Sequence, residues 1–155
     1  MNNHSAARDS TSASASGRID RLSAWQEERA KALIEASLGS SLSIAQLARE
    51  CAQSRCHFSR AFHGSTGLSP QQWLTRRRIE RAQQLLLGDS LLTRIAQDCG
   101  FADQAHFSRV FRRLVGCTPS QWRLAVLQHN RVANKRPGQR AVAAPAGDRY
   151  RVTYR

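Results

Sequence analysis

The sequence predicts an all-α protein in which two similar helical modules stand in tandem, joined by a long linker helix. The first observation is a repeat: the pattern His-Phe-Ser-Arg-x-Phe at residues 57–62 recurs at 106–111, followed in both copies by Gly, Pro, Gln and Trp at matching positions. The second is that apolar residues recur at helical intervals within each copy. A repeat of this length determines the architecture, so two copies of one helical unit are expected.

A first helix is expected over residues 21–38, before the first copy begins. Its apolar residues should cover the core of the first module, and they are Leu22, Trp25, Leu33, Ile34 and Leu38. An amphipathic helix of this kind buries its apolar stripe and leaves the charged face in water.

Each copy is expected to contain two short helices separated by a tight turn. The helices span 43–51 and 54–63 in the first module (43–64), and 91–99 and 103–115 in the second (90–113). Ser54 and Asp103 are suitable N-caps, because their side-chain oxygens can accept unpaired N–H groups of the first helical turn. The apolar stripes of the second helices are Phe58, Ala61 and Phe62, and Phe107, Val110, Phe111 and Leu114. This arrangement is the helix-turn-helix pattern, in which the second helix lies in the DNA major groove.

A linker helix is expected over residues 70–87, between the two modules. Ser69 and Pro70 form a good helix start, since proline at the first helical position loses no hydrogen bond, and Gly88 ends the helix. Thr118 and Pro119 open a last helix that should run toward Leu127.

A longer set of residues goes beyond the generic motif. In the second copy it comprises Ile95-Ala96, Cys99-Gly100-Phe101, Asp103, His106-Phe107-Ser108-Arg109, Phe111-Arg112-Arg113, Gly116, Thr118-Pro119 and Trp122-Arg123. The linker adds Pro70, Trp73-Leu74, Arg78-Ile79, Ala82 and Leu85-Leu86. Together they resemble the DNA-binding domain of AraC/XylS-type bacterial transcription regulators, over about residues 26–124. We place this domain at residues 21–127.

One residue departs from the family pattern. The first turn carries Ala52, where the family usually has glycine. If Ala52 adopts the left-handed conformation of a sharp turn, its side chain costs roughly 1–2 kcal/mol. The fold should survive this cost, although the orientation of the first recognition helix depends on the geometry of that turn.

The composition agrees with a nucleic-acid partner. The formal net charge is +13 and the pI is about 11.4, values typical of proteins that bind phosphate by charge. Nearly half of the excess charge lies after Ala125. The Ser/Ala-rich leader at residues 1–20 and the basic tail at 128–155 offer little apolar surface to bury, so both are expected to be disordered. The alternative for the tail is an arm that adds non-specific DNA contact.

The outward residues of the two second helices are the candidate base contacts. They are Arg55, Cys56, Ser59 and Arg60 in the first module, and Gln104, Ala105, Ser108 and Arg109 in the second. Arginine can pair bidentately with guanine, glutamine with adenine, and a small apolar group can touch the thymine methyl. The candidate DNA-backbone contacts are His57, Arg76, Arg77, His106, Arg112 and Arg113.

Several of these residue types have other readings. His57 and His106 could pack beside the turns instead of touching phosphate, and Trp73 and Trp122 are better explained as core than as stacking platforms. Cys51, Cys56, His57 and His63 have a spacing that zinc sites sometimes use, but Cys51 and Cys99 are adequately explained as small buried hydrophobes. We expect no metal and no cofactor. Cys56 should be exposed, where a redox switch is a hypothesis.

The sequence holds no catalytic constellation, so we expect a binding protein and no enzyme. The expected function is a sequence-specific transcription regulator of promoter DNA; the alternatives are a non-specific architectural DNA binder and an interaction module that has lost DNA binding. The resemblance implies an activator that contacts RNA polymerase, similar to small stand-alone members that bind DNA as monomers. No signal peptide or membrane span is recognised, so a bacterial cytoplasmic protein at the nucleoid is expected. Met1 favours a native start, and a fragment of a longer regulator is the alternative.

Overall fold

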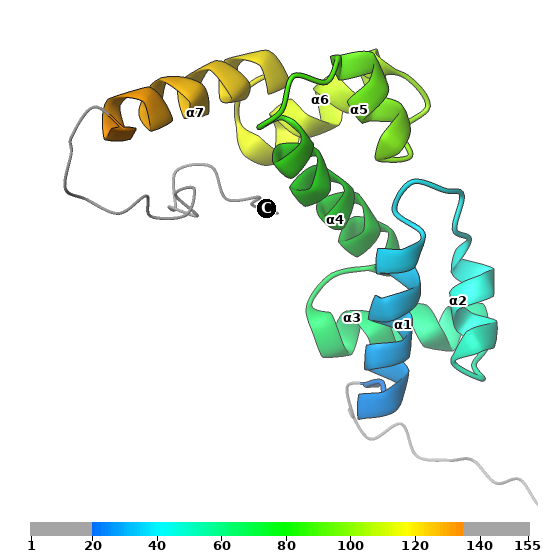
Figure 1. The fold of residues 1–155 in the computed structure, drawn as a ribbon. Coiled ribbons are helices and arrows are strands. Elements are labelled where there is room, and N and C mark those ends of the chain that lie inside the picture. Colours follow the sequence, from blue (N-terminus) through cyan, green and yellow to red (C-terminus); the bar gives the residue numbers. More distant parts are fainter. Residues whose placement is uncertain (1–19, 135–155) are drawn as a thin grey trace, which may run out of the picture.

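The computed structural model describes residues 20–134, and these residues contain seven helices and no strand. The helices are α1 (Ala24–Ala36), α2 (Ile44–Glu50), α3 (Arg55–Thr66), α4 (Pro70–Leu85), α5 (Leu92–Asp98), α6 (Gln104–Val115) and α7 (Pro119–Asn134). Helices α1, α2 and α3 gather at one end of α4, and α5, α6 and α7 gather at the other (Figure 1). The predicted all-α architecture is confirmed. The leader, apart from Asp20, lies outside the described residues.

Helix α1 covers the first core with one row of residues four apart. Leu22, Ala30, Ile34 and Leu38 are buried on this row or at its ends, as expected for residues that share one helix face. Trp25 was expected in the core and is 58% exposed, so that expectation was wrong. It follows Leu22 by three residues and falls beside the i, i+4 row that meets the module.

The two helix-turn-helix units form as predicted. Ser54 Oγ accepts the N–H of His57 at 3.3 Å, and Asp103 Oδ1 accepts the N–H of His106 at 2.6 Å, so both predicted N-caps are confirmed. Glycine ends both recognition helices in the left-handed conformation, with φ of 75° at Gly67 and 90° at Gly116. Each recognition helix therefore begins at a side-chain cap and ends at a glycine.

Each module has its own hydrophobic core. The predicted stripes of α3 and α6 are buried throughout, and Cys51 and Cys99 lie fully buried at equivalent places in the two cores. Trp122 is 8% exposed and meets Phe111 edge to face, with ring centroids 6.3 Å apart. Trp73 is only partly buried; it meets Phe62 in the same way at 6.0 Å.

Helix α4 belongs to both cores. Leu74 packs into the first, whereas Ile79, Ala82 and Leu86 pack into the second. Its 16 residues span about 24 Å at 1.5 Å per residue. The helix ends at Leu85, two residues before the predicted end, and the chain then turns before α5.

Helix α7 is longer than predicted. It begins at Pro119 and runs to Asn134, past the expected end at Leu127, so the first seven residues of the predicted tail are helical. Trp122 and Val126 hold its first half on the second core. The rest of the predicted tail lies outside the described residues. No helix in the described part of the chain is long and apolar enough to cross a membrane.

Candidate nucleic-acid interface

The outward face of α3 carries the predicted residues of the first module. Arg55, Cys56 and Arg60 are exposed, and Ser59 is half-buried. The Ser59 hydroxyl donates to the carbonyl of Arg55 at 2.9 Å, so its proton is used within the helix and its oxygen remains available as an acceptor. Since the opposite face of α3 is fully buried, this face is the one that can meet a partner.

Helix α6 presents the corresponding face of the second module. Gln104, Ala105 and Arg109 are exposed, and Ser108 is half-buried at the position that matches Ser59. Arg112 and Arg113 extend the exposed face through the last turn of the helix. The two faces therefore combine guanidinium, amide, hydroxyl and small apolar groups, which are the groups that read base edges.

The charge of these two helices is uncompensated. Helices α3 and α6 contain five arginines and no Asp or Glu: Arg55, Arg60, Arg109, Arg112 and Arg113. Within residues 20–134, none of the five makes an ion pair, although several arginines elsewhere do. Exposed arginines that have no carboxylate partner attract a polyanion.

Arg76 and Arg77 differ from the recognition-helix arginines. Arg76 Nε donates to Glu80 at 2.9 Å, and Arg77 is paired with both Glu35 and Glu80. The hydrogen bond to Glu35 raises the pKa of Arg77 above its usual value. Both residues were predicted to contact the DNA backbone. Because their guanidinium groups already bind carboxylates, a phosphate would have to displace these partners, and α1 is tied to α4 instead.

The two recognition-helix histidines are placed differently. His57 Nδ1 lies 3.6 Å from Asp20 Oδ2, whereas the His106 ring meets Phe101 edge to face at 5.6 Å. Both side chains are exposed near the start of their helices. His106 thus packs beside the turn, as the alternative interpretation held, and its exposed edge remains open to a phosphate.

The cysteines form no common site. Cys56 is exposed, as predicted, and Cys51 is buried with its Sγ 3.6 Å from the carbonyl oxygen of Gln26. Burial raises the pKa of Cys51 and that of Cys117, and it raises the pKa of Cys99 to about 11. Among the residues that the structure describes, no group of three or more His, Cys, Asp or Glu side chains could hold a metal ion.

Two arginines of the family pattern have structural roles that the sequence did not predict. Arg78 donates to the carbonyls of Leu38 and Ser40 at 2.9 and 2.8 Å, and Arg123 donates to those of Leu86 and Ser90 at 3.1 and 2.6 Å. Each arginine thereby fixes the loop that precedes the first helix of a module. Leu74, Arg78, Ala82 and Leu86 lie four apart along α4, and an arginine inside such an apolar row is the signal that could have marked Arg78.

The geometry defines a tandem helix-turn-helix protein with one basic recognition helix in each module. Residues 47–125 match the family model described as a helix-turn-helix domain, which is about half of the chain. The chain belongs to this helix-turn-helix family, in its AraC-type branch of DNA-binding transcription regulators. The expectation of a regulator and no enzyme agrees with this family.

Solved structures of the same type superpose on the described fold. An AraC-type transcriptional regulator from Chromobacterium violaceum is 30% identical with a TM-score of 0.61, covering 64% of this chain and 89% of that one. The DNA-binding domain of AdpA, solved in complex with a target DNA, is 31% identical with a TM-score of 0.64, covering 68% and 96%.

Curated relatives match over a shorter part of their length. The virulence regulon transcriptional activator VirF of Yersinia enterocolitica is 38% identical over 80 residues, which are 51% of this chain and 30% of VirF. The probable transcriptional regulator LumQ of Photobacterium leiognathi is 33% identical over 73 residues, 46% of this chain and 29% of LumQ. The chain therefore spans less than a third of the length of these relatives.

Proposed function

We propose that this protein binds a specific promoter sequence by inserting α3 and α6 of one chain into successive major grooves. The observation that carries the proposal is the pair of uncompensated basic recognition faces at opposite ends of α4. Successive major grooves on one side of B-DNA are about 34 Å apart, and α4 spans about 24 Å between two modules of finite width. A single chain can then read an asymmetric site without two-fold symmetry.

Arg60 and Arg109 are the proposed principal base readers. They occupy equivalent positions on the exposed faces of α3 and α6, and neither is bonded to a carboxylate within the described chain. Arg55, Cys56, Ser59, Gln104, Ala105 and Ser108 complete the two reading faces. Arg112, Arg113, His57 and His106 are proposed to contact phosphates, which position the helices without reading sequence.

The proposed role is activation at a promoter, with RNA polymerase as a protein partner. The printed name of VirF describes a transcriptional activator, and the AdpA domain is bound to a target DNA in its structure. A regulator of this kind acts at the nucleoid in the bacterial cytoplasm. We propose a monomer on DNA, because one chain already supplies two recognition helices.

A non-specific architectural binder is the second candidate, and the net charge of +13 favours it. Charge alone accounts for affinity that falls steeply with salt and is the same for all sequences. It does not account for a hydroxyl at the same position of both faces, Ser59 and Ser108, or for the amide of Gln104 on the second face.

The experiment that separates the two candidates is selection of the purified protein on a randomised duplex pool of about 20–25 bp, long enough for two major-groove contacts. The mass of the complex is measured in the same buffer. A specific regulator enriches an asymmetric two-part motif bound by one chain. An architectural binder enriches nothing, and its affinity falls equally for all duplexes as salt rises.

A further inference from the structure

The two modules touch beside α4, where glycines allow backbones to meet. A Cβ built on Gly100 would lie 2.6 Å from the carbonyl oxygen of Leu38, and one built on Gly39 would lie 2.9 Å from that of Asp98. Both obstacles are backbone atoms, which cannot move aside by a change of rotamer. The turn of the second module therefore rests directly on the α1–α2 loop of the first.

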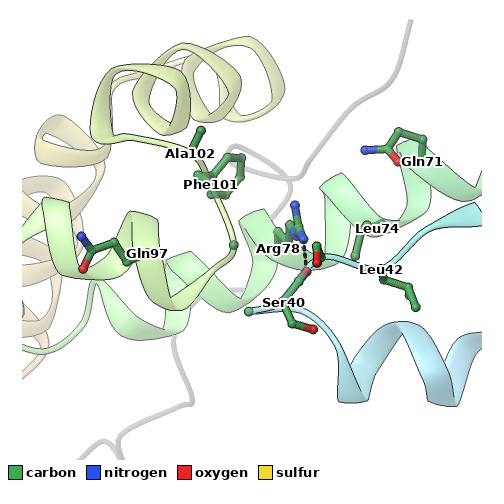
Figure 2. Close-up of a pocket in the computed structure, with 11 residues that line it drawn as sticks. Ser40, Leu42, Gln71, Leu74, Arg78, Gln97, Phe101 and Ala102 are labelled. Atoms are coloured by element: carbon green, nitrogen blue, oxygen red, sulfur yellow. Dashed lines mark hydrogen bonds between the residues drawn. The ribbon is translucent and has the colours of Figure 1, made fainter.

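Arg78 completes this contact, which we call the module junction: Gly39, Arg78 and Gly100. Its guanidinium donates to Leu38 and Ser40, and its Nη2 would lie 2.8 Å from a Cβ on Gly100. Figure 2 shows Arg78 reaching the Ser40 carbonyl, with Phe101 and Ala102 of the second module on the other side. One side chain from the shared helix thus holds the loop of one module and faces the turn of the other.

The two copies of the repeat differ in the way this contact requires. Ala52 occupies the turn position of the first module with φ of 53°, and it is exposed. The equivalent Gly100 has φ of 71° and no room for a side chain. Since the first turn accepts alanine, left-handed geometry alone does not require glycine at the second. Glycine is required at position 100 because the backbone of the first module lies so close to it.

The modules are connected by α4 and, beside it, by the module junction. An open hollow of about 490 Å³ lies at the junction, with Gln71 on one side and Gln97 and Ala102 on the other. The two cores are separate, and α4 passes from the first at Leu74 to the second at Ile79. A helix shared in this way fixes the distance between the modules along its axis, but helices can bend. Because the junction lies to one side of that axis, it opposes bending of α4.

We propose that the module junction fixes the angle between the two recognition helices, and thereby sets the spacing between the two half-sites that one chain reads. Gly39, Arg78 and Gly100 act as positioning residues, since none lies on a recognition helix. The statement about half-sites rests on the proposed function above. The statement about the angle does not, and the two are tested separately.

The DNA test uses the enriched site with the two halves moved together or apart by one and two base pairs. One base pair rotates a half-site by about 34° around the duplex. Wild type is expected to lose about tenfold in affinity for one inserted base pair, the scale of losing a base contact. Gly39→Ala and Arg78→Gln are expected to shift the preferred spacing or to reduce this loss to about threefold or less.

Two control variants can be made in the second module and the loop before it. A Cβ on Gly88, in the α4–α5 loop, would have only the Leu85 carbonyl near it, at an ordinary 3.7 Å, so Gly88→Ala should keep the wild-type spacing profile. Arg123→Gln breaks the same kind of carbonyl bonds as Arg78→Gln, but within the second module. It should weaken binding equally at every spacing. Unchanged profiles for folded Gly39→Ala and Arg78→Gln would overturn the proposal.

The second test needs no DNA. Spin labels on Cys56 and on an Ala105→Cys variant, in a Cys117→Ser background, report the separation of α3 and α6; Cys51 and Cys99 are buried. A narrow distance distribution is expected in wild type, and a shifted or broader one in Gly39→Ala. Identical distributions would overturn the junction's role. A shifted distribution with no enriched DNA site would leave that role standing and refute the proposed function.

Discussion

Ala52 and Gly100 occupy the same position in the two helix-turn-helix turns, and both have a left-handed backbone, with φ of 53° and 71°. The N–H of the next residue donates to the carbonyl of Ala48 in the first turn and of Ala96 in the second, both at 2.9 Å. The turn therefore keeps its geometry without glycine. The backbone strain that the sequence predicted for Ala52 is present in the structure.

Ala52→Gly is expected to stabilise the protein. Removing the left-handed alanine relieves roughly 1–2 kcal/mol of backbone strain in the folded protein. The extra conformational freedom of glycine stabilises the unfolded chain and offsets about 0.5–1 kcal/mol of this gain. The unfolding free energy should rise by about 0.5–1 kcal/mol, measured by urea denaturation. A decrease would show that the first turn carries no strain.

Gly116→Ala and Gly100→Ala test the cost of a side chain with and without a steric obstacle. Both glycines have positive φ, but a Cβ on Gly116 would meet nothing within 4 Å. Gly116→Ala should lower the unfolding free energy by about 0.5–1 kcal/mol, because roughly 1–2 kcal/mol of backbone strain is partly offset by the smaller freedom of alanine in the unfolded chain. Gly100→Ala should lose clearly more, because Leu38 must also move. Equal losses in denaturant titrations would contradict the backbone contact.

The salt dependence of DNA binding should distinguish free from paired arginines. Arg112→Ala and Arg113→Ala should each reduce the slope of log K against log salt by about 0.9, the value for one lost phosphate contact. Arg76→Ala should reduce it by clearly less, since Arg76 is bonded to Glu80. Equal reductions would restore Arg76 as a backbone contact.

Cys99 should make the protein sensitive to alkali. Burial raises its pKa from 9.0 to about 11, so the folded chain holds the thiol proton at pH values where the unfolded chain loses it. The contribution of this thiol to the free energy of unfolding is therefore complete below pH 9. It falls by about 2–3 kcal/mol as the pH rises toward 11. Cys99→Ala should flatten this fall in denaturation curves taken from pH 8 to 11. An equally steep fall in the variant would assign it to other groups.

Local sequence signals predicted most of the helices. The repeat, the Ser54 and Asp103 caps and the apolar stripes depend on neighbours within one or two turns, and all of these are found. The predictions that Trp25 is buried and that the last helix ends near Leu127 were wrong. A large apolar residue at a helix start can pack or face solvent depending on tertiary neighbours, and the chain after Leu127 carries no strong stop signal.

The candidate site was predictable in part. Exposure of the recognition residues follows from helix periodicity, so their placement on one face was expected. Which arginines are already paired depends on contacts far apart in sequence. Arg77 meets Glu35 and Arg78 meets the carbonyls of Leu38 and Ser40, across about 40 residues, and no local pattern specifies such partners.

The measurement that tests the central claim most directly is the randomised-duplex selection repeated with Arg60→Ala and Arg109→Ala. Each variant should bind with the other half of the motif intact and lose discrimination by about 1–3 kcal/mol at the positions its arginine reads. The two relaxed halves should be different, one for each recognition helix. Motifs that stay unchanged in both variants, or that weaken uniformly at every position, would contradict the account.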